Sequence, residues 1–248
     1  MVRRTFFPAA LFASALIALP AIAQTPSPQL AAAVADPSRP ATDTARDADR
    51  KPAQVIAFAG VRPGDKVADL IPASGYFTRI LARLVGPSGH VYAATPQALA
   101  SRPGALDATN AIAAANPNVT AGVVDFAKMD FPEKLDVIWT SENYHDFHNF
   151  PVVDAVALDR VMFNALKPGG VLYVEDHQAA PGTGATATNT LHRIEADTVI
   201  KEVEAAGFKL EARSDLLANP ADPHTAGVFS PSIRGKTDKF VLRFRKPK

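Results

Sequence analysis

Acidic, aromatic and imidazole side chains are concentrated in one short segment of this chain, residues 142–149. Imidazole is the side-chain type whose ordinary pKa lies near neutrality, so His145 or His148 could serve as a general base toward a hydroxyl or amine. Tyr144 adds an aromatic wall and Glu142 a carboxylate. We therefore predict that the catalytic residues of an enzyme are Glu142, Tyr144, His145 and His148.

The same segment permits a second kind of chemistry if it is helical. Glu142, His145 and His148 would then recur every third residue on one side, which would allow a divalent metal to bind. The spacing of these three residues alone is a weak indication of metal binding. The main interpretation therefore assigns no metal ligand, and a metal-dependent enzyme built on this cluster is an alternative. A serine hydrolase is not indicated, because neither Ser74 nor Ser141 lies in a G-x-S-x-G turn.

A second group of residues marks a place where a nucleoside could bind. An apolar run over 66–71 contains Asp69 and passes through a tight turn, ending at Gly75, into a helical pattern that begins at Tyr76. Sheets of this kind bind ligands in a crevice at the carboxyl ends of their strands. The residues at successive predicted strand ends, which we expect to form the crevice, are Asp69, Gly75, Tyr76, Thr95 and Asp125.

This strand, turn and helix resembles motif I of class I S-adenosylmethionine (SAM)-dependent methyltransferases, whose pattern is acidic-x-Gly-x-Gly-x-Gly. Here the three glycine positions fall on Ile71, Ala73 and Gly75. Glycine lets the backbone approach a ligand closely, so Pro72 and Ala73 are expected to narrow the cofactor site. A side chain at Gly75 is expected to enter the ligand's space. The family's ribose-binding acid is also missing, because Thr95 stands at its position.

The resemblance extends in element order from about Val55 to Arg245. Asp125 and Phe126 are similar to the family's adenine-contact segment, which implies a hydrogen bond from the adenine amino group to Asp125. Residues 167–170 read Lys-Pro-Gly-Gly, a turn that the family commonly has before its fifth strand. The resemblance implies SAM as the cofactor, bound by Asp69, Pro72, Gly75, Tyr76, Thr95, Asp125, Phe126 and Ser141.

The elements that must position these residues alternate between strand and helix. Strands are predicted over 66–71, 89–94, 118–124, 135–140 and 170–176. Helices are predicted over 76–85, 152–166 and 195–206, and the Ala-rich region 96–116 is expected to be helical with an interruption at Pro103 and Gly104. Two final strands, 208–214 and 239–245, have no helix between them and suit an antiparallel hairpin. We predict an α/β, Rossmann-like methyltransferase fold: a mostly parallel seven-stranded sheet with an antiparallel C-terminal hairpin and helices on both faces.

The start of the chain has the order of a secretory signal. Arg3 and Arg4 precede an apolar run, which is followed by the small-residue triplet 21–23. The run is shorter than the ~20 residues that a membrane span needs. We expect a signal peptide over 1–23, a Pro/Ala-rich linker over 24–52 and a methyltransferase-like domain over 53–248 that starts with a docking helix near Pro52. A periplasmic or secreted protein without stable membrane insertion follows.

Charge and cysteine content restrict the partners. Of the 26 basic residues, Arg3 and Arg4 leave with the signal peptide, so 24 remain against 25 acidic residues. This balance gives no preference for nucleic acid. With no cysteine, the chain has neither disulfides nor thiolate metal sites.

Other polar residues flank the predicted site. Asp176 is expected to orient a neighbouring imidazole, and Arg193, Arg234 and Lys236 to bind an anionic substrate group. The favoured function is SAM-dependent methyl transfer to a small exported or envelope molecule. A non-catalytic module that binds a nucleoside or metabolite on a degenerate methyltransferase fold is the other alternative.

Overall fold

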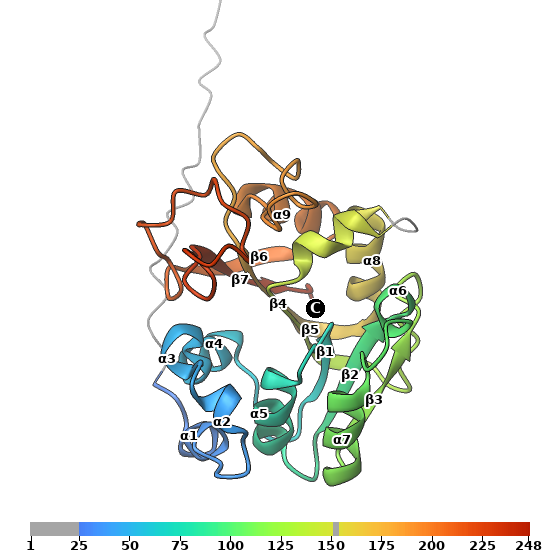
Figure 1. Ribbon diagram of the computed structural model, residues 1–248. Helices are drawn as coiled ribbons and strands as arrows, with labels where there is room; N and C mark the ends of the chain where they lie inside the picture. The colour runs from blue at the N-terminus through green and yellow to red at the C-terminus, as the bar shows by residue number, and fades with distance from the viewer. Residues whose placement is uncertain (1–24, 151–153) are drawn as a thin grey trace, which may run out of the picture.

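The computed structural model describes residues 25–150 and 154–248, and a seven-stranded sheet runs through this part of the chain (Figure 1). The strand order is β3-β2-β1-β4-β5-β7-β6. Strands β1 to β5 pair in parallel, and β7 runs antiparallel between β5 and β6. The predicted fold class is confirmed. The strands are β1 (Lys66–Leu70), β2 (His90–Pro96), β3 (Val119–Val124), β4 (Leu135–Ser141), β5 (Leu166–His177), β6 (Lys209–Ser214) and β7 (Lys239–Arg245).

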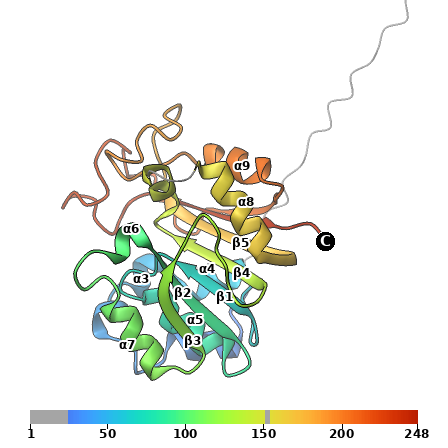
Figure 2. The same ribbon diagram turned by 90° about the vertical axis from the view of Figure 1, so that its right-hand side faces the viewer.

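Helices cover both faces of the sheet, as the two views show (Figures 1 and 2). Successive strand residues point to opposite faces. On β4, Val137 and Trp139 enter one core together with helices α1, α4 and α5, whereas Ile138 enters the other core with α8 and α9. The helices are α1 (Pro28–Val34), α2 (Ala41–Thr44), α3 (Asp47–Arg50), α4 (Pro52–Ala59), α5 (Tyr76–Val85), α6 (Gln97–Ala100), α7 (Asp107–Ala115), α8 (Ala155–Ala165) and α9 (Ala196–Ala205).

Local signals set the ends of the helices that flank β1. Proline lacks the N–H that a first helical turn leaves unpaired, so Pro52 suits the start of α4. Gly60 ends that helix in the left-handed region, with φ 79°. Helix α5 buries a stripe that includes Phe77, Ile80 and Leu84 against the sheet. The predicted docking helix is thus confirmed, and β1, its turn and α5 lie where the sequence pattern placed them.

The linker predicted over 24–52 is wrong for residues 28–50, which form α1, α2 and α3. Ser27 caps α1 by accepting a hydrogen bond from the Leu30 amide (3.1 Å), and Leu30 is buried. Arg39 forms an ion pair with Asp47 (2.6 Å). The composition is typical of a linker, but its charged side chains pair with one another and pack against α5, which orders the segment. The predicted signal peptide lies outside the described residues.

Helix α8 begins later than the predicted residue 152. The Asp154 carboxylate accepts a hydrogen bond from the Val156 amide (3.1 Å) and caps the helix at Ala155; residues 151–153 are outside the description. Among the described residues, no helix is both long and apolar enough to cross a membrane.

Candidate active site

The turn after β1 keeps the backbone shape of a glycine-rich loop although two of its glycines are missing. The φ angles of Ile71, Ala73 and Gly75 are 53°, 50° and 79°. All three family glycine positions therefore lie in the left-handed region, which costs a non-glycine residue about 1–2 kcal/mol. Such strain persists where the surrounding structure imposes it, and it clusters at binding and catalytic sites.

The space beside Gly75 is filled by protein rather than left for a ligand. A Cβ atom built on Gly75 would lie 2.2 Å from Cδ1 of Ile112, which belongs to α7. The expectation that a side chain here would enter ligand space was wrong, because α7 packs against this turn. Tyr76 also has a partner within the protein: its side chain is buried, and its hydroxyl donates a hydrogen bond to Asp47 (2.5 Å).

Asp69 lies at the end of β1 and is 4% exposed. Its Oδ2 accepts a hydrogen bond from the Thr78 hydroxyl in the first turns of α5 (2.6 Å). Burial raises the pKa of Asp69 to about 7, against the opposing effects of the Thr78 hydrogen bond and the positive charge of Arg50. Asn143 connects this turn to the end of β4 by donating to the Leu70 carbonyl (2.8 Å).

The remaining predicted cofactor contacts lie on neighbouring strands, as expected. Thr95 is buried near the end of β2. Asp125 follows β3; its carboxylate accepts from the Ala127 amide (3.0 Å) and its side chain is 56% exposed. Phe126 is buried in the core, with its ring centroid 6.1 Å from that of Phe147. Asp125 is thus accessible to a ligand, whereas Phe126 supports the wall behind it.

The catalytic segment predicted over 142–149 forms a 3-10 turn, η1 (Tyr144–Asn149), and its polar side chains separate. Glu142 precedes η1 with φ 60°. Its carboxylate forms ion pairs with Lys239 (2.7 Å) and Arg50 (3.2 Å), which hold the pKa of Glu142 well below its ordinary value against the effect of burial. The imidazole of His148 lies 3.1 Å from a carboxylate oxygen of Glu202 in α9. The alternative in which Glu142, His145 and His148 together bind a metal is therefore not supported, because Glu142 and His148 have different partners.

Tyr144 is not the aromatic wall that the sequence suggested. Its side chain is fully buried in the core with α8 and α9. The hydroxyl donates to Asp159 (2.9 Å) and lies 3.3 Å from Glu202. Because the 3-10 turn directs this ring into the core, we assign Tyr144 to packing.

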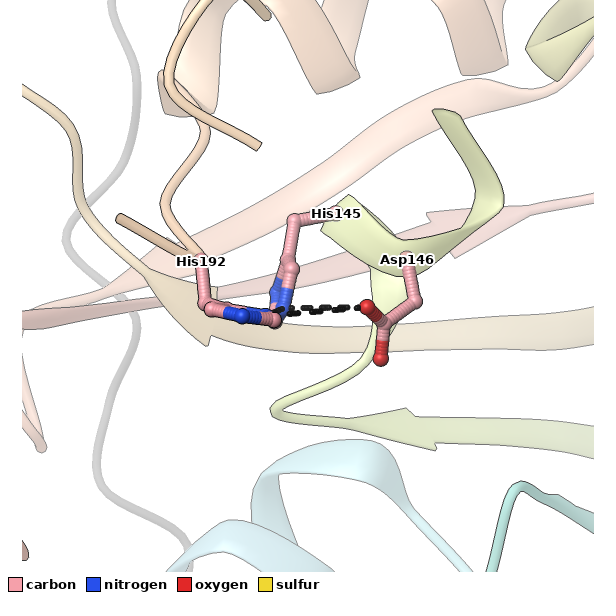
Figure 3. A group of neighbouring side chains, drawn as sticks. All are labelled: His145, Asp146 and His192. Atoms are coloured by element: carbon pink, nitrogen blue, oxygen red, sulfur yellow. Dashed lines mark hydrogen bonds and ion pairs between the residues drawn. The ribbon is translucent and has the colours of Figure 1, made fainter. Parts of the chain in front are cut away.

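His145 contacts three polar side chains near the end of β5: Asp176, His192 and Asp146. Its Nδ1 is 2.8 Å from Asp176 Oδ1, so Asp176 orients the ring as predicted. Its Nε2 is 3.2 Å from Nδ1 of His192 and 3.5 Å from Oδ1 of Asp146 (Figure 3). Burial disfavours the imidazolium of His145, but the nearby carboxylates, Asp176 foremost, raise its pKa overall.

A cavity of about 440 Å³ lies beside this group, a size typical of small-molecule sites. Its lining residues come from α3 and the residue before it, the residue after β4, the end of β5, the connection before β7 and the start of β7. Four of them are cationic and two are carboxylates: Arg46, Arg50, Arg234, Lys239, Asp49 and Glu142. This excess of positive charge favours an anionic ligand.

The N-terminal segment supplies part of this wall. Arg50 is buried, donates to the Ser141 hydroxyl (3.0 Å) and stacks 4.5 Å from the Tyr76 ring centroid. Ser141, predicted to contact the cofactor, instead donates to Glu175 (3.1 Å). Arg46 and Arg50 were not predicted as site residues, because both lie in the segment 24–52 that was predicted to be a linker. The positions of both residues depend on the packing of α3.

The polar clusters predicted to bind an anion have different roles. Arg193 is fully buried; it pairs with Asp222 (2.8 Å) and donates to the Gln178 carbonyl (2.9 Å), so it is structural. Lys236 is exposed and does not line the cavity, whereas Arg234 does. His192 and Asp146 were not assigned, although both occur in polar stretches that the sequence made visible.

A larger cavity of about 790 Å³ lies at the opposite edge of the sheet. Its lining includes Asp65 before β1, Lys167 at the start of β5 and Arg245 at the end of antiparallel β7. These are the amino ends of the parallel strands. Open α/β sheets bind their ligands at the carboxyl ends, so we place the functional site at the smaller cavity.

Comparisons with known proteins agree with this geometry. No model of a known protein family matches the chain. The chain is 35% identical over 120 residues to the ubiquinone/menaquinone biosynthesis C-methyltransferase UbiE of Pasteurella multocida, a match covering 48% of this chain and 42% of that protein. The chain thus matches less than half the length of this curated relative.

The solved structures establish the fold. A SAM-dependent methyltransferase from Aquifex aeolicus superposes with a TM-score of 0.60 at 16% identity, over 86% of this chain and 96% of that chain. The [4+2]-cyclase SpnF superposes with a TM-score of 0.59 at 17% identity, over 81% of each chain. The protein therefore has the class I methyltransferase fold. SpnF is named for a different reaction, so this fold by itself does not determine the reaction.

Proposed function

We propose that this protein is a SAM-dependent methyltransferase. The observation that carries the proposal is the turn over 71–75, whose backbone keeps the left-handed conformation of a glycine-rich loop at Ile71, Ala73 and Gly75. Ile71 and Ala73 are strained in that conformation. Backbone strain of this kind clusters at binding and catalytic sites, which supports a functional role for the turn. The match with a curated methyltransferase supports the same reaction.

The residues present fit a bound nucleoside cofactor at the ends of β1, β2 and β3. Asp125, which is exposed, would face its adenine, whereas Asp69 and Thr95 are buried and would lie beneath its amino-acid part and its ribose. Thr95 provides one hydroxyl where the family has a carboxylate, which predicts modest affinity. When bound, SAM supplies an electrophilic methyl group. The chain's own task is to hold the acceptor in line with that group, which is worth up to about 7–11 kcal/mol of barrier.

The acceptor side is the 440 Å³ cavity together with His145. If Asp176 holds the proton on Nδ1 of His145, Nε2 carries a lone pair that can accept a proton from the acceptor once its 3.2 Å contact with His192 Nδ1 opens. Arg46 and Arg234 line the cavity and favour an acceptor that carries a carboxylate or phosphate. We propose a small anionic molecule as the substrate.

Export is a further part of the proposal, and it rests on the order of residues in 1–23. The substrate is then a small periplasmic, secreted or envelope molecule. Mass spectrometry of the protein from its host should find a mature terminus near Gln24. An intact N-terminus in a cytoplasmic fraction would remove this part of the proposal and leave the catalytic part standing.

Calorimetry of the mature protein with SAM and with S-adenosylhomocysteine tests the cofactor. We expect saturable binding of both, with stoichiometry near one, and about tenfold weaker binding after Asp125→Ala if its carboxylate accepts from adenine. Asp197→Ala is the matched control, because its carboxylate is 78% exposed and lies on α9. No heat with either ligand from folded protein would refute the proposal.

A second candidate is a binding module without catalysis, which the replacements at Ile71, Ala73 and Thr95 favour. It predicts that a nucleoside binds but that no methyl group leaves SAM in the presence of any anionic acceptor. Release of S-adenosylhomocysteine during incubation with pools of small anionic metabolites distinguishes the two functions.

A further inference from the structure

Three potential metal ligands converge at the edge of the candidate active site. The distances are 3.2 Å from His145 Nε2 to His192 Nδ1, 3.5 Å from His145 Nε2 to Asp146 Oδ1 and 3.8 Å from His192 Nδ1 to Asp146 Oδ1 (Figure 3). Zinc bonds to nitrogen and oxygen of about 2.0–2.1 Å in a tetrahedron put neighbouring ligands about 3.3 Å apart. The triangle is therefore close to one face of a tetrahedral site.

A carboxylate behind His145 completes the pattern expected of a metal-binding imidazole. Asp176 is fully buried, and its Oδ1 lies 2.8 Å from Nδ1 of His145. A hydrogen bond from Nδ1–H to a carboxylate fixes the tautomer that leaves Nε2 free to ligate. Asp176 also accepts a hydrogen bond from the His145 backbone amide (2.7 Å), which fixes the carboxylate beside the residue whose ring it orients.

His192 is held toward this point by an unusual backbone. Its φ of 56° is in the left-handed region, where strain marks a constrained position. The side chains of His192 and Asp146 are 33% and 30% exposed, so an ion can enter from solvent. The His192 ring centroid lies 5.0 Å from that of Phe229, which lines the 440 Å³ cavity.

We propose that His145 Nε2, His192 Nδ1 and Asp146 Oδ1 bind a divalent ion with the coordination preference of zinc, leaving its fourth position open. Two imidazoles and one carboxylate with an open position are the arrangement of a catalytic rather than a structural zinc site. A direct hydrogen bond between the two imidazoles is the competing explanation for their proximity, and the experiment below separates the two.

The role of the ion in catalysis rests on the proposed function. An acceptor hydroxyl or thiol bound at the open position would lose its proton to solvent more easily, because the ion lowers its pKa. The acceptor atom then forms a bond to the methyl carbon. The carbon–sulfur bond of the sulfonium breaks, and its electron pair stays on sulfur to give S-adenosylhomocysteine. In the metal-bound protein, His145 is a ligand and the ion replaces it in activating the acceptor.

The test is direct titration of the metal-stripped mature protein with Zn²⁺ and Co²⁺. We expect one equivalent to bind, and the Co²⁺ form to absorb visible light with the intensity of a four-coordinate ion. Asp146→Ala should weaken binding at least about tenfold, and Asp176→Asn about 10–100-fold. His90→Ala is the control, because His90 lies at the start of β2, at the opposite end of the sheet, and bonds Thr120.

His192→Gly removes the third ligand while accommodating the left-handed backbone, so the variant should fold and lose tight binding. Circular dichroism and thermal unfolding verify folding in each variant. Less than about 0.1 equivalent of ion in folded wild-type protein would overturn the site, as would unchanged affinity in His192→Gly. Because these titrations need no SAM, and the calorimetry with SAM needs no metal, failure of one proposal is distinguishable from failure of the other.

Discussion

Replacing Asp69 by asparagine should stabilise the protein at alkaline pH. The carboxyl is buried at the end of β1 and accepts a hydrogen bond from Thr78, which an asparagine oxygen can accept as well. Burial raises the pKa of Asp69 from 3.8 to about 7 in the folded protein. Above about pH 7 the buried carboxyl of the wild-type protein ionises at a cost in folding free energy, and the variant avoids this cost.

Proton linkage gives the sign and the size of the stability difference between Asp69→Asn and the wild-type protein. Well below pH 3.8 the carboxyl is protonated in both the folded and the unfolded chain, so the substitution is nearly neutral there. Between the two pKa values the unfolded chain releases a proton that the folded chain retains, and the free energy of unfolding falls as pH rises. The gap from 3.8 to about 7, at about 1.4 kcal/mol per pH unit, sets an upper limit of about 4 kcal/mol.

Urea denaturation of wild type and Asp69→Asn at about pH 4, 6 and 8 measures this difference. We expect the variant's advantage to grow with pH and to level off above about pH 7. Asp197→Asn, on the surface of α9, should change stability by less than about 0.5 kcal/mol throughout. An advantage that does not depend on pH, or a variant less stable at pH about 8, would refute the reasoning. Because perturbed carboxyls occur at functional sites, the stabilised variant should also bind SAM more weakly by calorimetry.

Ala73→Gly should raise the free energy of unfolding in urea by about 0.5–1 kcal/mol, because it relieves a left-handed residue at some cost in chain entropy; a loss of stability would contradict the strain. Gly75→Val should lower it by more than about 2 kcal/mol. Part of that loss should return in an Ile112→Ala background, and an equal loss in both backgrounds would exclude the predicted clash. Asp222→Ala should lower the free energy of unfolding by about 3–5 kcal/mol, because it leaves Arg193 buried and unpaired. An Arg193→Met, Asp222→Ala double variant should recover much of that loss. Equal thermal stability of the single and the double variant would contradict a buried charge pair.

The order of strands and helices could be predicted from the sequence because each element leaves a local pattern. Apolar runs of strand length and the helical stripe after Tyr76 depend on neighbours within a few residues. The predicted strand over 239–245 matches β7 residue for residue. The turn over 71–75 was recognised in the same way, although its backbone conformation at Ile71 and Ala73 was not, since neither residue favours a positive φ.

The segment over 28–50 was misjudged because its composition alone does not distinguish a linker from packed short helices. Whether Arg39 and Asp47 meet each other or water depends on α5, which lies further along the chain. The same limit applied to Tyr144, whose ring could have faced either the cavity or the core. Only the direction of the 3-10 turn decided that it faces the core.

The sequence by itself determined the fold class, the β1 turn and the concentration of polar side chains in the segment over 142–149. Tertiary structure alone decided which groups meet there. Arg50 reaches Ser141 across 91 positions of the chain, and His145 reaches His192 across 47. Such contacts leave no periodic pattern in the sequence, because the strand order and the paths of the loops bring the two residues together. The candidate metal triangle of His145, Asp146 and His192 is therefore a property of the fold, whereas the elements that carry it are properties of the sequence.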